Sequence, residues 1–300
     1  MLQQQNLAVC YGEVLWDILP DGPQAGGAPL NVCYHLNKLG LPAGMISCIG
    51  DDDNGHKLID VMRSAGIATN LIQTNATQQT GEVIAEINGT EEVRYTIVSP
   101  VAWDYIEYQQ EQAAALDAAR YLVFGTLASR NAASRDTLFR LLETDAIKVF
   151  DVNLRQPHFT PTLLHNLLLK TDILKCNQEE INIICELFDA PNDNHSQILF
   201  LIEKFELKEV ILTRGRKGAL YFNGDDVFKA HPPVIKMADT IGSGDAFLAA
   251  FIYNHYHQKQ PQTIIDNAVA MGAFVASKKG GCPVYQPIEL HEFLNYRLQL

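Results

Sequence analysis

The sequence has little positive charge for its length. It contains 23 lysines and arginines against 35 aspartates and glutamates, which gives a formal net charge of −12. Such a chain is poorly suited to neutralising nucleic-acid phosphates or to adhering to an anionic membrane. No apolar run reaches membrane-spanning length, and the first residues, MLQQQNLAVCYGE, have neither the basic nor the apolar region of a signal peptide. We therefore expect no nucleic-acid partner, no membrane association and a cytoplasmic location.

Several cofactor motifs are also missing. The six cysteines form no C-x-x-C pair and have no histidine at zinc-finger spacing, so we interpret them as reduced thiols. No Gly-Lys dipeptide occurs, which excludes a P-loop. Phe247 stands where a dinucleotide fingerprint would need its third glycine, which disfavours a nucleotide-binding oxidoreductase. Any nucleotide site must therefore be of another kind.

What the 300 residues do contain is an alternation of short apolar runs and segments with helical periodicity. This rhythm predicts one α/β domain over residues 1–300, with a central, mostly parallel sheet, helices on both faces, and a ligand at the carboxyl ends of the strands. The predicted helices cover 29–39, 132–142, 178–187 and 197–205. The predicted strands are LAVCYG, AGMISCIG, RYLVFG, IKVFDV, DILKCN and EVILTRG.

Two segments, at about 13–20 and 80–98, break this rhythm. The second reads as two alternating strands joined through Asn88-Gly89, which is typical of a hairpin. Consecutive antiparallel strands do not belong inside a βαβ series, so both segments predict a small β lid that excludes water from the strand ends. Open strand edges tend to pair, and we therefore also expect a homodimer through the lid.

The most informative segment runs from Asp239 to Asp245 in the sequence DTIGSGD and precedes an apolar helix. Gly242 and Gly244 leave backbone N–H groups free to converge on a phosphoryl group at the positive end of that helix. Asp245 is then placed to accept the proton of an attacking alcohol. Taken alone, the segment fits equally well a tight turn followed by an ordinary helix acid.

A second segment, Gly26-Gly27-Ala28-Pro29-Leu30-Asn31, also joins glycines to a helix start. It would let a polyol approach the backbone, with the Asn31 amide as donor and acceptor and Asp17 of the lid as a further acceptor. The alternative is an ordinary loop that leads into a helix. Because the segment occurs together with the glycine-rich turn, we favour a functional interpretation.

Together, GGAPLN, GDDDNG and DTIGSGDAFLAA resemble the two signatures of the ribokinase-like (PfkB) sugar kinases. GEVLWDILP, DVNLR, NQEE and TRGRKG extend the resemblance over essentially the whole chain, with Cys33 as a small departure. The resemblance implies the ribokinase-like fold and ATP-dependent phosphorylation of a small carbohydrate. It assigns the base to Asp245, the anion hole to the amides of Gly242, Ser243 and Gly244, the sugar contacts to Asp17, Gly27 and Asn31, and a sugar or phosphate contact to Arg155.

The resemblance also implies a nucleotide site and metal ions. Thr213, Gly215 and Gly218 match the segment that lies at the ATP phosphates and ribose in relatives. Asn177 and Glu180 match the pair that orders Mg²⁺, largely through water. Asp239 and Ile241 match residues that hold K⁺, although the remaining ligands would come from a loop near Gly280 where this sequence diverges from ribokinase.

The substrate is narrowed by the GEVLWD opening, GGAPLNV and PVAWD, which look most like fructokinases and predict conversion of D-fructose to fructose 6-phosphate. YTIVSPVA lacks the arginine expected of a 2-keto-3-deoxygluconate kinase, while ribose, tagatose phosphate and nucleosides stay open as substrates. A non-catalytic sugar-binding regulator would not need Asp245 at an anion hole.

We interpret Trp16 and Trp103 as packing between lid and core, and Asp51–Asp53 as a helix cap.

Overall fold

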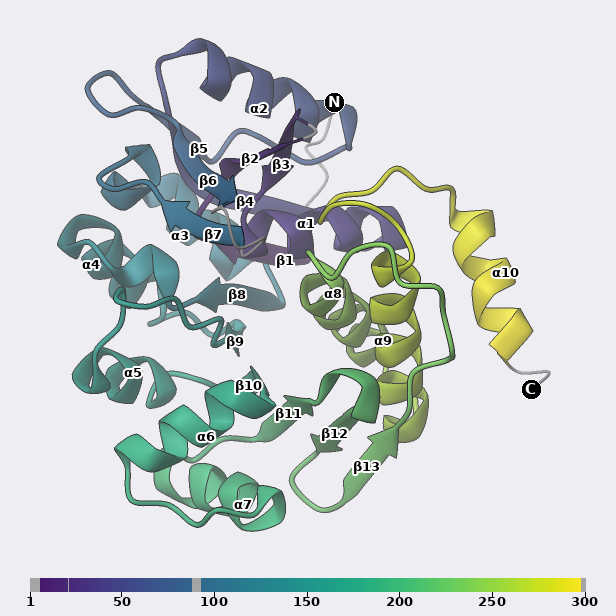
Figure 1. The fold of residues 1–300 in the computed structure, drawn as a ribbon. Coiled ribbons are helices and arrows are strands. Elements are labelled where there is room, and N and C mark those ends of the chain that lie inside the picture. Colours follow the sequence, from purple (N-terminus) through teal and green to yellow (C-terminus); the bar gives the residue numbers. More distant parts are fainter. Residues whose placement is uncertain (1–5, 21, 88–92, 298–300) are drawn as a thin grey trace.

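The structure, a computed structural model, describes residues 6–20, 22–87 and 93–297 (Figure 1). At its centre is a nine-stranded sheet in the order β13-β12-β11-β10-β9-β8-β1-β4-β5. The strands from β5 to β11 in this order are parallel, and β12 and β13 continue the sheet antiparallel at one edge. The bounds are β1 (Ala8–Tyr11), β4 (Ala43–Gly50), β5 (Ile72–Asn75), β8 (Tyr121–Gly125), β9 (Ile147–Asp151), β10 (Ile173–Asn177), β11 (Glu209–Thr213), β12 (Ala219–Phe222) and β13 (Val227–Ala230).

Helices cover both faces of this sheet, and the residues of β1 show why. Ala8 and Cys10 belong to one hydrophobic core, whereas Val9 and Tyr11 belong to a second core on the other face. A strand that is covered on both sides has no polar face, so it reads as a continuous apolar run. The mostly parallel α/β sheet predicted from such runs is confirmed.

The helices divide between these two cores. The first core takes α1 (Ala28–Leu39), α2 (Asp53–Ser64), α8 (Ser243–Tyr256) and α9 (Pro261–Ala276), with α10 (Pro287–Arg297) packed outside α9 (Figure 1). The second core takes α3 (Gln110–Asp117), α4 (Ala132–Leu141), α5 (Pro161–Leu168), α6 (Gln178–Leu187) and α7 (Asn194–Phe205).

A second, four-stranded sheet has the order β3-β2-β6-β7, with β3 (Gly22–Gly26), β2 (Leu15–Leu19), β6 (Gly81–Ile87) and β7 (Val93–Ile97). The antiparallel pairing of β6 with β7 agrees with the predicted hairpin, whose Asn88-Gly89 turn lies outside the described residues. The structure adds β3, which the sequence did not suggest. It also starts this sheet at Leu15, because Glu13 and Val14 are buried beside the central sheet.

The two sheets are joined by polar and aromatic contacts. Asp52 caps α2 by accepting the Gly55 N–H at 2.7 Å, as the cap interpretation of this acidic run predicted. It also accepts the Thr80 N–H at 2.8 Å, just before β6. Trp103 is fully buried against Gly81 and under the Arg130 guanidinium, which confirms its packing role.

Two further findings concern the cysteines and the apolar character of the helices. All six cysteines lie in the described ranges and are free thiols, five of them buried. Among the described residues, no helix has the length and apolar character needed to cross a bilayer.

Candidate active site

The glycine-rich turn forms the start of α8. Gly242 is the N-cap residue with φ of 72° and offers no side-chain cap, and a Cβ at this position would collide with Gly281 of the loop before α10. The Ser243 N–H makes a long bond to the Thr240 carbonyl at 3.3 Å. The first N–H groups of a helix have no partner within it and carry the positive end of its dipole. This end of α8 is therefore suited to hold an anion.

Asp245 lies in the first turn of α8 and is 9 % exposed. It accepts a hydrogen bond of 2.8 Å from the Asn31 amide, so two residues 214 positions apart in the sequence meet at one point. Burial raises the pKa of the Asp245 carboxyl to about 6, with the Asp151 carboxylate adding to the rise and Lys175, Asn31 and Arg155 opposing it. A carboxyl with a pKa near 6 is still mostly ionised at neutral pH and is a stronger base than an ordinary aspartate.

The predicted sugar contacts gather beside Asp245. Gly27 starts α1 with φ of 112°, and a Cβ there would collide with the Glu13 carbonyl. The pKa of the Asp17 carboxyl in β2 is raised to about 6, mainly by burial. The Arg155 charge opposes this rise, and the Asp239 carboxylate adds to it. Arg155 is exposed in the loop after β9, and its charge lowers the pKa of Asp245 as well as that of Asp17.

Asn177 and Glu180 form a capping box at the start of α6. The Asn177 side chain accepts the Glu180 N–H at 2.9 Å, and Glu180 accepts the Asn177 N–H at 2.8 Å and the Leu154 N–H at 3.0 Å. Burial and then the Asp151 carboxylate raise the pKa of Glu180. The residues 6–20, 22–87 and 93–297 contain no cluster of three metal-ligating side chains. Asn177 and Glu180 offer hard oxygen donors. Two such residues fit Mg²⁺, because this ion retains waters and takes its other ligands from substrate phosphates.

The predicted nucleotide segment lies one strand further along. Thr213 ends β11 directly opposite Asn177 of β10. Gly215 and Gly218 follow in the turn between β11 and β12 with φ of 54° and 82°. A side chain at Gly218 would collide with the Ala230 carbonyl, so this turn requires glycine for packing as well as for backbone conformation.

The predicted K⁺ residues join two segments. Asp239 accepts the Ile241 N–H at 3.0 Å within its own turn and the Gly280 N–H at 3.1 Å from the loop before α10. The turn and the loop named for this site are therefore adjacent. K⁺ binding itself stays a prediction.

Sequence reasoning missed three functional candidates. Lys175 bonds both oxygens of Asp151 at 2.7 and 2.8 Å, and its only sequence signal is a lysine inside an apolar strand. Glu13 is 3 % exposed and has its pKa raised to about 7, mainly by burial. The Cys282 thiol donates to the side-chain amide oxygen Oδ1 of Asn31 at 3.1 Å, a contact over 251 positions that no local pattern indicates.

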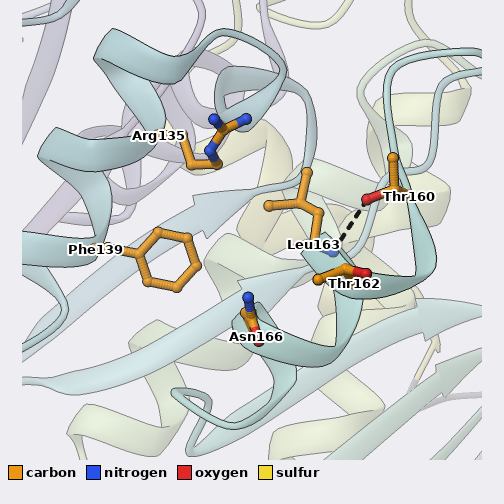
Figure 2. A pocket seen from close by; sticks show the side chains of 6 residues that line it. All are labelled: Arg135, Phe139, Thr160, Thr162, Leu163 and Asn166. Atoms are coloured by element: carbon orange, nitrogen blue, oxygen red, sulfur yellow. Dashed lines mark hydrogen bonds between the residues drawn. The ribbon is translucent and has the colours of Figure 1, made fainter.

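A separate cavity of about 370 Å³ lies between α4 and α5 (Figure 2). Its lining contains none of the predicted site residues, and Thr160, on its rim, caps α5 by accepting the Leu163 N–H at 3.1 Å. We therefore place the candidate active site at the strand ends and not in this cavity. The lining residues are Arg135, Phe139, Thr160, Thr162, Leu163 and Asn166.

The fold and this arrangement of residues define a sugar kinase, and the chain belongs to the pfkB family of carbohydrate kinases, whose model matches residues 22–287. It is 30% identical to a fructokinase of Klebsiella pneumoniae over 260 residues, covering 80% of this chain and 81% of that protein. It is 25% identical to a 5-dehydro-2-deoxygluconokinase of Halalkalibacterium halodurans, covering 96% and 90%. It is 24% identical to an aminoimidazole riboside kinase of Salmonella typhimurium, covering 98% and 97%.

Solved structures give the same fold. A fructokinase with bound ATP from Xylella fastidiosa superimposes with a TM-score of 0.88 at 20% identity, covering 98% of this chain and all of that one. The family and the ribokinase-like fold predicted from the sequence motifs are thus confirmed.

Proposed function

We propose that the protein transfers the γ-phosphoryl group of ATP to a hydroxyl of a small carbohydrate, with D-fructose to fructose 6-phosphate as the first candidate reaction. The observation that carries this proposal is the buried Asp245 carboxyl, bonded to Asn31 at the uncapped start of α8. Bound ATP in the fructokinase of Xylella fastidiosa supports the choice of nucleotide.

In the proposed mechanism Asp245 accepts the proton of the attacking hydroxyl. The sugar oxygen forms a bond to the γ-phosphorus while the bond from that phosphorus to the β,γ-bridging oxygen breaks, and ADP leaves. The N–H groups of Gly242, Ser243 and Gly244 hold the transferring group at the positive end of α8. Asn31 and Asp17 orient the sugar, and Gly27 lets it approach the backbone.

Charged groups around this centre complete the proposal. Arg155 is an exposed cation in the loop after β9, able to reach the sugar or the phosphoryl group. Glu180 and Asn177 would hold Mg²⁺ through water, and the ion would neutralise phosphate charge during transfer. Thr213, Gly215 and Gly218 would contact the nucleotide, and Asp239 with Ile241 would take K⁺.

Fructose is favoured because the Klebsiella pneumoniae fructokinase has the higher identity among the three relatives compared. A sugar acid or an aminoimidazole riboside is the second candidate, since relatives with those names cover 96% and 98% of this chain, against 80% for the fructokinase. An ADP-release assay over fructose, ribose, a nucleoside, 5-dehydro-2-deoxygluconate and 2-keto-3-deoxygluconate decides the matter. If another substrate exceeds fructose tenfold in kcat/KM, about 1.4 kcal/mol of discrimination, the fructose assignment is wrong.

We also propose that residues 1–300 act as a single cytoplasmic kinase domain whose lid is the β3-β2-β6-β7 sheet, and that two copies pair through this lid. Closure over the sugar should slow hydrogen exchange in β6 and β7 when fructose is added. Unchanged protection over 81–87 and 93–97 would refute closure, and a sedimentation velocity run showing only monomer would refute the dimer.

A further inference from the structure

A buried ion pair close to the base joins the last residue of β9 to the middle residue of β10. Lys175 and Asp151 are register partners in the two parallel strands, with side chains 9 % and 6 % exposed. A Cβ placed on Gly244 would lie 3.3 Å from the Lys175 ammonium nitrogen. The lysine head therefore lies close to Gly244, in the turn that opens α8.

A buried ion pair is a costly way to fill a core. Desolvating the two charges consumes most of their attraction, and apolar residues of similar volume are often as stable or more so. Glu180 and Asp245 bring additional negative charge close to the Lys175 ammonium. A purely structural explanation leaves the placement of this pair against Gly244 unaccounted for.

We infer that the Lys175–Asp151 pair is a positioning element for phosphoryl transfer: its ammonium fixes a positive charge against the Gly242–Gly244 turn, and the pair governs the readiness of Asp245 to accept a proton. This inference rests on the proposed role of Asp245 as the base. Because Lys175 lies beside the turn, we assign it a positioning role that acts through Gly244 and Asp245.

The two members of the pair act on Asp245 with opposite sign. Asp151 raises the pKa of the Asp245 carboxyl and Lys175 lowers it, so the pair as a whole holds that pKa between the values each member would set alone. The Lys175 ammonium donates to both oxygens of Asp151, at 2.7 and 2.8 Å. The other groups that face Asp245 are Asn31 of α1, Arg155 after β9, Glu13 after β1 and Cys282 of the loop before α10.

The test compares four variants with wild type, using ATP and the sugar that wild type turns over fastest. These are Lys175→Met, Asp151→Asn, the double variant with both changes, and Asp172→Asn. Asp172 is the matched control, because it forms ion pairs with Lys148 and Lys208 just before β10, at the opposite end of the same strand. The measurements are kcat, KM, the acidic midpoint of the kcat–pH profile and Tm.

We expect Lys175→Met to move the acidic midpoint upward and Asp151→Asn to move it downward, each by half a pH unit or more, with Asp172→Asn unchanged. The double variant should recover the Tm lost in Lys175→Met while kcat stays at least tenfold below wild type and KM changes less. If Lys175→Met does not fold, Asp151→Asn and the double variant carry the test.

A merely structural pair gives a different result. The midpoints would then stay fixed or move in the same direction, or the double variant would regain wild-type kcat together with Tm, and either outcome overturns the inference. Asp245→Asn keeps the two proposals apart. If that variant retains its turnover, the proposed base is wrong; if it is inactive while the midpoints stay fixed, only the inference about the pair fails.

Discussion

The two ends of helix α8 are built in opposite ways. At its carboxyl end, His255 bonds the Tyr121 hydroxyl at 2.7 Å and Glu209 at 3.0 Å, and Glu209 also accepts the Tyr221 hydroxyl at 2.9 Å. At its amino end, Gly242 provides no side-chain cap and Asp245 is buried near a second carboxylate. One end matches each polar group with a partner, whereas the other places like charges together.

The contacts at the carboxyl end are explained by folding stability alone, whereas those at the amino end indicate a role in the reaction. A histidine beside the negative end of a helix, with an acid as its partner, is electrostatically favourable and needs no function to explain it. A carboxyl held near another carboxylate lowers folding stability, and such groups with shifted pKa values concentrate at functional sites. We therefore expect activity to depend on the amino end of α8, and stability to respond in opposite directions at its two ends.

The largest effect is expected from Asp245→Asn. The substitution keeps the shape of the side chain but removes the base, so kcat should fall by about 100-fold to 10,000-fold, the usual worth of general base catalysis. KM values for ATP and sugar should change far less. The exposed Asp53 on α2 is the control, and Asp53→Asn should be nearly silent. If Asp245→Asn keeps more than about a tenth of wild-type turnover, its assignment as base must be abandoned.

The next effect is the dependence of turnover on pH. The base must be ionised to accept a proton, and the pKa of Asp245 is raised to about 6. Turnover should therefore be near its plateau above pH 7 and fall about tenfold per pH unit well below pH 6. A profile measured from pH 4.5 to 8.5 checks this. A flat profile down to pH 5 would mean that the proton acceptor is not a carboxyl raised in this way.

Stability should respond in opposite directions at the two ends. His255→Phe removes one hydrogen-bond partner each from Tyr121 and Glu209, and we expect it to cost about 1–3 kcal/mol of unfolding free energy while kcat changes less than twofold. Urea unfolding and an activity assay on the same preparation measure both. A large loss of kcat with unchanged stability would erase the contrast between the ends.

Asp245→Asn should instead stabilise the protein, and more so at high pH. The folded pKa of about 6 lies above the ordinary value of 3.8, so the folded state binds the proton more tightly than the unfolded state. The destabilising effect of the ionised group is therefore absent below pH 4 and complete above pH 6. We expect a gain of roughly 1–3 kcal/mol at pH 8 and little gain at pH 4.5. Equal Tm values for variant and wild type at pH 8 would contradict this.

Some of this architecture is readable from sequence because it is local. The buried strands can be predicted from apolar runs, and the start of α8 is encoded in seven consecutive residues. β3 gave no such signal, since its sequence GPQAG has low strand propensity; Pro23 is tolerated because β3 is an edge strand.

The rest depends on register and on contacts over long sequence separations. The pairing of Lys175 with Asp151 follows from the alignment of β9 and β10, which neither strand specifies alone. The burial of Glu13 depends on the approach of Gly27, 14 positions later and after two lid strands. Contacts of this kind leave no pattern within a window of residues, although they set the electrostatics of the site.

The smallest effect is expected at Cys282, which sharpens the description of the amino end of α8. Its thiol donates to the side-chain amide oxygen of Asn31, and this fixes the amide so that its N–H group faces Asp245. Cys282→Ala removes a weak donor, so kcat should fall only about two- to fivefold, the equivalent of roughly 0.4–1 kcal/mol. Cys282→Ser keeps a donor and should retain most of the turnover. If the alanine and serine variants behave alike, the Asn31 amide is oriented by other contacts and the thiol has no part in positioning the base.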